Sequence, residues 1–211
     1  MTRTVPIIIG LTFAAILTIV LCTLTGPAGF GIPYGGPGAA DIVGGIRFPR
    51  VLAAFFVGAS LAVAGAAMQA LFKNPMADPY ILGTSSGGAL GASLAIVFLG
   101  GFFVPLFAWV GAVVAILIVW SIAGRRGIIS VETLLLTGIA VSFFFSAIVS
   151  FLIAIAGQNV HQIIFWLMGG FWNASPADAI LSALILVPAG ALLFFMARDL
   201  NALSLGEETA A

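Results

Sequence analysis

Long apolar runs, separated by short polar or glycine-rich segments, dominate the chain. Five runs are long enough to cross the roughly 30 Å hydrocarbon core of a bilayer as helices, and they cover residues 5–24, 51–72, 102–123, 134–156 and 177–197. A sixth run, residues 82–100, is apolar but rich in glycine and serine. We count it as a span because, without it, Lys73 and the Arg125–Arg126 pair would fall on opposite sides of the membrane. The pattern predicts an all-α, polytopic membrane protein with about six transmembrane helices.

A shorter apolar stretch, residues 160–172, has about 13 residues and is too short to cross a bilayer. It follows the fifth span, so it predicts a short external helix over residues 160–170, on the same side as the glycine- and proline-rich loop 25–46. The first apolar run is longer than the hydrophobic core of a signal peptide, and no A-x-A cleavage site follows it. We therefore expect this run to be retained. No soluble domain, linker or long low-complexity tract interrupts the sequence, so residues 1–211 are expected to form a single transmembrane domain.

The composition indicates that lipid is the main solvent of this chain. Only 7% of the residues are charged, against roughly 25% in a soluble domain, and 62% are hydrophobic. These values exclude an ordinary soluble enzyme and a disordered chain. Seven basic and seven acidic residues leave no net charge, which excludes a nucleic-acid binder, since that needs a basic patch. The single cysteine, Cys22, and the single histidine, His161, exclude an internal disulfide and a histidine-rich metal centre. We expect no metal and no cofactor.

The positive charges predict the orientation of the spans, because lysine and arginine are enriched in cytoplasmic loops. With the N-terminus inside, Arg47 and Arg50 lie outside, and the cytoplasmic side receives Arg3, Lys73, Arg125, Arg126 and Arg198. We therefore expect a multi-pass protein of the cytoplasmic (inner) membrane with both termini in the cytoplasm. No charged residue falls in the middle of a span. Ion-coupled transporters keep ionisable residues there, so the energy for transport is expected to come from another chain.

Small or polar residues recur every four positions on three predicted helices, which places them on one face of each helix. The second and third spans carry small-residue stripes, namely Ala54, Gly58, Ala62, Ala66 and Ala70, and Gly83, Gly87, Gly91 and Ala95. These stripes predict close packing of the two helices on each other or on other helices. The fifth span carries Ser142, Ser146 and Ser150 on one face with Gly138. These serines either bond the carbonyls four residues earlier or line a water-accessible path.

Three polar clusters stand at the ends of predicted spans. Arg47-Phe-Pro-Arg50 precedes the second span; its arginines are either headgroup anchors or a cationic dock for the carboxylates of an external partner. Lys73-Asn-Pro-Met-Ala-Asp78-Pro79 joins the second and third spans, and its prolines predict a stiff turn. The third cluster is Asn201-Ala-Leu-Ser-Leu-Gly-Glu-Glu208. Its Ser204 and Glu207 form a capping-box pattern, which predicts the start of a cytoplasmic helix.

In this order, the clusters and the runs between them resemble the FecCD-type permeases. The resemblance extends from about residue 40 to residue 208 and is carried by RFPRVLAAFFVGASLAVAGAAMQALFKNPMADPYILGTSSGGALGA, LLLTGIAVSFFFSAIVSFL, IIFWLMGGFW and LNALSLGEE. It implies a membrane-spanning permease subunit of an ATP-driven ABC importer for iron chelates (siderophore, haem) or cobalamin, with ATP hydrolysed on a separate chain. It also implies the ten-helix fold of vitamin B12 importer permeases. This chain would form the first part of that fold and would not itself be an enzyme.

The same resemblance implies roles for the polar residues. A substrate-binding protein would dock outside on Arg47 and Arg50, and the cytoplasmic gate would include Asn74, Pro75 and Asp78. The pathway would be lined by Ser142, Ser146 and Ser150. Coupling to the ATPase would involve Ser204, Leu205, Gly206, Glu207 and Glu208. The implied partners are an ABC ATPase, a periplasmic or lipid-anchored substrate-binding protein, a second permease subunit forming a homodimer, and membrane lipid.

Because the chain stops at Ala211, where the coupling helix of the family begins, we expect it to lack the last four spans and to bind an ATPase weakly or not at all. Other functions remain open. An ion-coupled transporter, a channel or a purely structural membrane subunit would have this composition. Gly83-Thr-Ser85-Ser-Gly87 matches the G-x-S-x-G pattern of serine hydrolases. However, His161 is predicted about 20–30 Å away, across the bilayer, far beyond hydrogen-bond reach.

Overall fold

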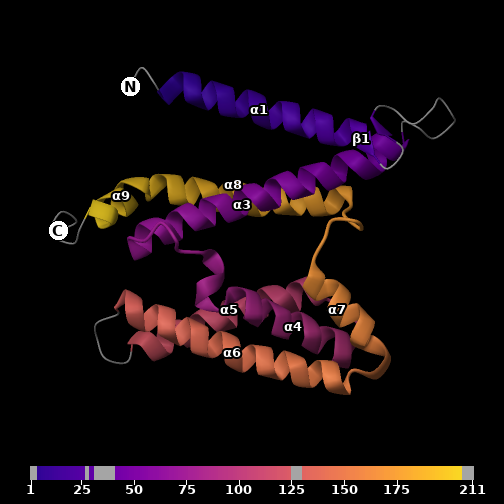
Figure 1. The fold of residues 1–211 in the computed structure, drawn as a ribbon, viewed down its shortest axis with the longest axis vertical. Helices are drawn as coiled ribbons and strands as arrows, with labels where there is room; N and C mark the ends of the chain where they lie inside the picture. Colours follow the sequence, from indigo (N-terminus) through magenta and orange to yellow (C-terminus); the bar gives the residue numbers. More distant parts are fainter. Residues whose placement is uncertain (1–3, 27–28, 31–40, 125–129, 206–211) are drawn as a thin grey trace. The chain divides into compact units, whose positions relative to one another are not determined.

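A computed structural model describes residues 4–26, 29–30, 41–124 and 130–205 of the chain, and Figure 1 shows its ribbon. The elements are, in order, α1 (Thr4–Leu24), β1 (Thr25–Gly26), β2 (Gly29–Phe30), the π-helix η1 (Ile42–Arg47), α3 (Phe48–Phe72), the 3-10 helix η2 (Pro79–Leu82), α4 (Thr84–Leu99), α5 (Val104–Ala123), α6 (Val131–Ile155), the 3-10 helix η4 (Gly157–Asn159), α7 (Val160–Met168), α8 (Pro176–Phe195) and α9 (Ala197–Leu205). The two short strands pair antiparallel, with Thr25 opposite Phe30.

The predicted all-α, polytopic fold class is confirmed. Within the described ranges, five helical stretches are long and apolar enough to cross a membrane: Val5–Leu24, Ile42–Phe72, Val104–Ala123, Val131–Ile155 and Pro176–Phe195. The helix over the sixth predicted span, α4, has 16 residues, which corresponds to about 24 Å. It is therefore shorter than the hydrocarbon core, and Gly100 and Gly101, both with positive φ, end it. The short helix predicted over residues 160–170 is α7, which ends at Met168, before Gly169.

The helix over the second predicted span begins earlier than the sequence pattern indicates. We predicted that the two arginines precede this span, whereas η1 and α3 form one helical stretch from Ile42 to Phe72. Arg47 is the last residue of η1, and Arg50 lies in the first turn of α3. Pro49 is the second residue of α3, and proline is tolerated in the first turn of an α-helix.

The chain forms two compact units. The first comprises residues 1–63 and 171–198, and the second comprises residues 64–170 and 199–211. The first unit thus contains α1, the N-terminal part of α3, and α8. The second unit contains the C-terminal part of α3 and the helices from α4 to α7 (Figure 1).

The closest helix packing in the second unit is between α4 and α5. A Cβ atom added at Gly91 would overlap the Phe107 carbonyl, and one added at Gly87 would overlap the Gly111 carbonyl. The glycines therefore let the two backbones touch, as small residues do at helix contacts in lipid. The close packing predicted for this stripe is confirmed, with α5 as the partner. On the stripe-bearing helix α3, by contrast, a Cβ at Gly58 would meet no atom of the described residues within 4 Å.

Two buried hydrophobic clusters hold the second unit together. The first cluster joins the end of α3, η2, α5 and α6, and consists of Phe72, Ala77, Leu82, Ala115, Val119, Val141 and Phe145. The second cluster joins α4, the start of α5 and α7, and consists of Ala92, Ala95, Ile96, Val104, Ala156 and Ile163. The amide of Asn159 adds a hydrogen bond of 3.4 Å to the Ile96 carbonyl near the end of α4. The turn after α3 is thereby anchored to α5 and α6, and the short helix α7 is anchored to α4 and the start of α5.

Candidate functional site

The first candidate site is the arginine pair where η1 meets α3. The Nη1 atom of Arg47 donates a hydrogen bond of 3.4 Å to the Leu24 carbonyl at the end of α1. The guanidinium of Arg47 also lies against Gly26 in β1, where a Cβ atom would overlap it. A cation beside the last carbonyls of a helix is favourable, because those carbonyls carry the negative end of the helix dipole. Arg47 therefore fastens the end of α1 to the start of α3. Figure 1 shows these two helix ends near each other.

Arg50 joins a third segment to this place. Its Nη2 atom donates a hydrogen bond to the backbone carbonyl of Trp172, in the turn that precedes α8. Its Nε atom is buried and has no hydrogen-bond partner among the described residues. Leaving a buried donor unpaired costs roughly 1–3 kcal/mol, and more for a charged group. Arg47 thus joins the end of α1 to the start of α3, and Arg50 joins the start of α3 to the turn before α8. One N–H donor of Arg50, at Nε, lacks a hydrogen-bond acceptor among the described residues.

The second candidate site is the exposed turn between α3 and η2. The side-chain oxygen of Asn74 accepts a hydrogen bond of 2.9 Å from the backbone N–H of Met76. A carboxylate oxygen of Asp78 accepts one of 2.8 Å from the backbone N–H of Tyr80, which caps η2. Asn74, Pro75 and Asp78 are all exposed. The turn is therefore held by its own side chains while its polar groups remain accessible.

This turn and the serine face of α6, which are far apart in the sequence, meet through η2. A Cβ atom at Gly138 on α6 would overlap the Ile81 carbonyl of η2, so the glycine permits direct backbone contact. Gly83, with φ 80°, follows η2 in the left-handed conformation that glycine adopts most readily. A Cβ atom at Gly83 would lie 3.5 Å from the Ser142 hydroxyl. The end of η2 thus lies directly beside the serine face.

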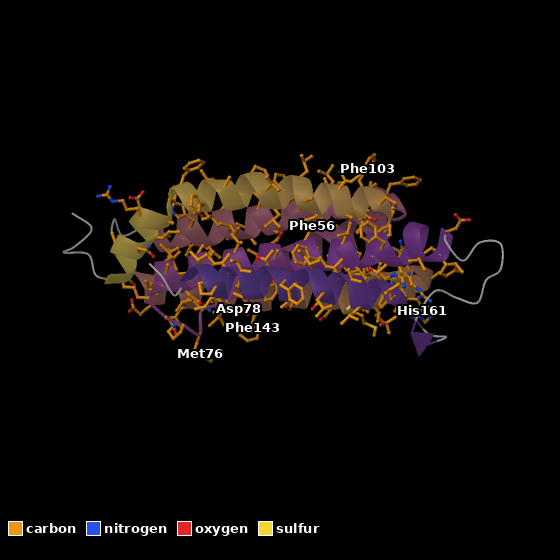
Figure 2. The ribbon with its side chains drawn as sticks, turned by 90° about the horizontal axis from the view of Figure 1, so that it is seen from above. Phe56, Met76, Asp78, Phe103, Phe143 and His161 are labelled. Atoms are coloured by element: carbon orange, nitrogen blue, oxygen red, sulfur yellow. The ribbon has the colours of Figure 1, made fainter. Side chains whose placement is uncertain are left out.

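A hollow of about 420 Å³ opens at this contact. It is lined by Ile81, Leu135, Ile139, Ser142, Phe143 and Ser146. Ser142 is half-buried, whereas Ser146 and Ser150 are exposed. Ser150 donates a hydrogen bond of 2.9 Å to the Ser146 carbonyl, which is the bond expected of a serine that only packs within its helix. The wall is therefore uncharged and mostly apolar, with the hydroxyls of two serines as its polar groups. Asp78 and His161 lie toward opposite ends of the second unit (Figure 2).

Replacing Gly138 with alanine tests the contact between η2 and α6. The added methyl group meets a backbone carbonyl that cannot turn away, so we expect a loss of about 1–3 kcal/mol in the free energy of unfolding. Thermal unfolding in detergent measures this change. The matched control is Gly58→Ala, whose methyl group has open space and should not destabilise the helix. Equal stability of the two variants would contradict the contact.

The predicted ATPase-coupling residues lie at the end of the described chain. Ser204 and Leu205 belong to the last turn of α9, which begins at Ala197. The expectation that Ser204 starts a helix is therefore wrong. Helix-favouring residues before it, such as Arg198 and Leu200, allow the helix to begin earlier. The remaining coupling residues, Gly206, Glu207 and Glu208, lie outside the described residues.

The groups that a serine hydrolase would need are not brought together. Ser85 lies in the first turn of α4 and follows a 3-10 helix rather than a strand. His161 lies in α7, whose neighbouring residue Asn159 contacts Ile96 at the other end of α4. Roughly 16 Å of helix separates Ser85 from Ile96, so the imidazole cannot activate this serine. The described part of the chain contains no group of three His, Cys, Asp or Glu residues that could hold a metal.

Sequence reasoning missed the groups to which the arginines bind. Leu24 and Trp172 act through backbone carbonyls, which every residue carries, so no side-chain pattern identifies them. Gly26 belongs to a loop with many glycines and does not stand out among them. The sequence does mark Gly138 as a possible site of close packing, because it is the smallest residue of the serine face. The nature of its contact with Ile81 is visible only in three dimensions.

The five long apolar helical stretches among the described residues define a multi-pass, α-helical membrane protein. Its fold is similar to that of a solved protein assigned to the metal-chelate type of ABC transporter, in an inward-facing conformation. The TM-score is 0.85 and the sequences are 31% identical; the match covers 97% of this chain and 66% of the solved chain.

The profile of the FecCD transport family matches residues 7–211, and the chain belongs to this family. It is 39% identical to the cobalamin import system permease protein BtuC of Halobacterium salinarum, over 99% of this chain and 56% of the relative. It is 37% identical to the uncharacterized ABC transporter permease protein YvrB of Bacillus subtilis, over 86% and 54%. It is also 37% identical to the vitamin B12 import system permease protein BtuC of Salmonella paratyphi A, over 78% and 51%. The chain spans about half the length of these curated relatives.

Proposed function

We propose that this chain acts in the permease of an ABC importer that carries an iron chelate, such as a siderophore complex or haem, or cobalamin across the cytoplasmic membrane. The observation that carries the proposal is the FecCD family match, which extends over residues 7–211. The likeness to a transporter of the metal-chelate type supports the chelate class. The names of two relatives support cobalamin as a member of that class.

The hollow beside α6 supports a role for the serine face as part of the pathway. Its wall contains two serine hydroxyls and no formally charged side chain. A bulky chelate would therefore meet weak, sequence-tolerant contacts rather than one strong ion pair, which favours passage over retention. The exposed turn of Asn74, Pro75 and Asp78 is joined to this hollow through η2. We assign the turn to the cytoplasmic gate of the pathway. Ser142 and Ser146 are assigned to its wall at the hollow, and Ser150 to the continuation of the same face of α6.

The FecCD family match and the charge distribution support the remaining roles. With the N-terminus in the cytoplasm, the arginine pair faces outward and docks the carboxylates of a substrate-binding protein. The C-terminal segment, which contains Ser204, Leu205, Gly206, Glu207 and Glu208, lies in the cytoplasm and contacts an ABC ATPase. A second permease subunit completes the pathway as a homodimer. Residues 1–211 contribute a single transmembrane domain to this assembly.

Reconstitution of the complete permease subunit tests the proposal. The subunit, its ATPase and its substrate-binding protein are placed in liposomes, and the uptake of radiolabelled cyanocobalamin and of a ferric siderophore is measured. We expect uptake of at least one of these probes to require ATP and the binding protein. Uptake that needs neither of them, and that follows a proton or sodium gradient, would contradict the proposal and favour an ion-coupled transporter.

Cysteine accessibility tests whether the serine face lines a water-filled path. In the assembled importer with Cys22 replaced by serine, we expect Ser146→Cys to react with a charged, water-soluble thiol reagent about tenfold faster than Phe144→Cys, since only a hydrated thiol ionises readily. Phe144 is the matched control because it lies on the same helix and its side chain is 63% exposed. Equal rates at the two positions would place the serines against lipid or protein and would exclude them from the pathway.

A further inference from the structure

We propose that Arg50 is a switch between an internal and an external acceptor. In this proposal, a carboxylate that docks on Arg50 displaces the Trp172 carbonyl and releases residues 171–173 from α3. The proposal rests on the docking role assigned to the arginine pair above. It adds a consequence of docking, namely a change in the freedom of the turn that leads into α8.

One hydrogen bond from Arg50 reaches the turn that precedes α8. Arg50 donates from Nη2 to the Trp172 carbonyl, and both residues belong to the first unit. The Trp172 side chain is 48% exposed, so a partner can approach the turn. The Nε atom of the same guanidinium is buried and has no partner among the described residues. Arg50 therefore holds the turn with one hydrogen bond while a second charged donor remains unused.

A carboxylate can accept a hydrogen bond from the unpaired Nε of Arg50 as well as from Nη2, whereas a single carbonyl cannot. The guanidinium is a planar fork whose N–H groups bind the two oxygens of a carboxylate in parallel. A single carbonyl oxygen cannot accept two such parallel bonds. Replacing the Trp172 carbonyl with a carboxylate would allow both Nε and Nη2 to donate, and it would also pair the positive charge. Replacing the carbonyl with a carboxylate is therefore favourable for Arg50. The replacement breaks the hydrogen bond between Arg50 and the turn that precedes α8.

The released turn lies at a junction of the chain. The chain passes from the second unit to the first between Gly170 and Phe171. Gly169 and Gly170 have φ values of 66° and 150°, a region open to glycine at little cost. After the turn, the capping box of Ser175 and Asp178 fixes the start of α8. The Arg50 bond thus restrains a short segment between two permissive glycines and a rigid helix start.

Arg47 provides the comparison within the same site. Its guanidinium is held by the Leu24 carbonyl and packs against Gly26. These contacts join α1 to α3. Arg47 therefore anchors the site, while Arg50 responds to the partner. A lysine at either position retains the positive charge but loses the planar fork.

The experiment measures backbone hydrogen exchange of the chain in neutral lipid nanodiscs. The probe is hexaglutamate, with hexaglutamine as the uncharged control, and fluorescence anisotropy of the labelled peptides measures binding. The reporter is the amide of Ala174, which donates to the Phe171 carbonyl within the turn. We expect hexaglutamate, but not hexaglutamine, to accelerate the exchange of this amide about tenfold, as expected for the loss of a hydrogen bond to a charged group.

Two variants make the outcome specific. Arg50→Lys should exchange about tenfold faster at the Ala174 amide without any probe, and hexaglutamate should add nothing further. Arg47→Lys should retain the response of the wild type. Unchanged exchange in α4 around Gly91 shows that each variant is folded. If hexaglutamate binds the wild type without accelerating exchange, or if Arg50→Lys exchanges like the wild type, the switch is disproved and docking stands. If hexaglutamate does not bind, docking on carboxylates fails, and the switch fails with it.

Discussion

Replacing Gly91 with alanine is expected to lower the free energy of unfolding by about 3 kcal/mol, the upper end of the usual range for overpacking. The added methyl group would overlap the Phe107 carbonyl and its carbon atom. These are backbone atoms of α5, so no side-chain rotation relieves the clash. The two helices would have to move apart along their whole contact, and the packing of Gly87 against Gly111 would be lost as well.

The matched control for this variant is Gly190→Ala in α8. A methyl group at Gly190 would meet no atom of the described residues within 4 Å, and alanine is favoured over glycine inside a helix by about 1 kcal/mol. The same chemical change is therefore expected to stabilise one helix and to disrupt the packing of another. Unfolding followed by tryptophan fluorescence in mixed detergent micelles measures both changes. Two variants with effects of the same sign and size would contradict the close contact between α4 and α5.

Reversing both charges of the arginine pair is expected to abolish uptake that depends on the substrate-binding protein. In the complete subunit, Arg47→Glu combined with Arg50→Glu would place carboxylates opposite the carboxylates of the partner. Such like-charge contacts cost several kcal/mol, so we expect at least about a hundredfold weaker binding. Uptake into proteoliposomes and surface plasmon resonance with the binding protein measure the two effects.

A lysine pair separates docking from the structural role of the arginines. Arg47→Lys combined with Arg50→Lys retains the charge, so we expect it to keep most of the association rate while weakening the contacts to the Leu24 and Trp172 carbonyls. Raising the salt concentration should slow association for the wild type and the lysine pair alike, because screening weakens charge steering. If the glutamate pair takes up substrate like the wild type, the arginines do not dock the partner.

Most helices of this chain were predictable because hydropathy over a long window is a local property. The apolar runs starting near residues 5, 134 and 177 correspond to α1, α6 and α8, with ends that differ by a few residues. The start of the α3 stretch was less predictable. Gly44, Gly45 and Pro49 resemble the residues of a loop, yet η1 and α3 form a single helical stretch through them. These residues are local signals for a boundary, and a helix that continues through them is visible only in the structure.

The candidate sites were predictable in their side chains but not in their contacts. The spacing of Ser142, Ser146 and Ser150 identified a polar face, and the structure distinguishes Ser150, which bonds within its helix, from the two serines that line the hollow. The arginine pair was evident from its charge. Its bonds to Leu24 and Trp172 depend on segments that are distant in the sequence, and on carbonyl groups that every residue has.

The sequence by itself determined the solvent of this protein, the positions of its helices and the chemical character of each helix face, because these depend on neighbouring residues and on the helical period. Only the tertiary structure decided which faces meet. It placed the glycine stripe of α4 on α5, η2 on Gly138, and the Trp172 carbonyl on Arg50. The physical reason is that these contacts involve backbone atoms brought together by packing, and a backbone atom has the same chemistry wherever it stands in a sequence.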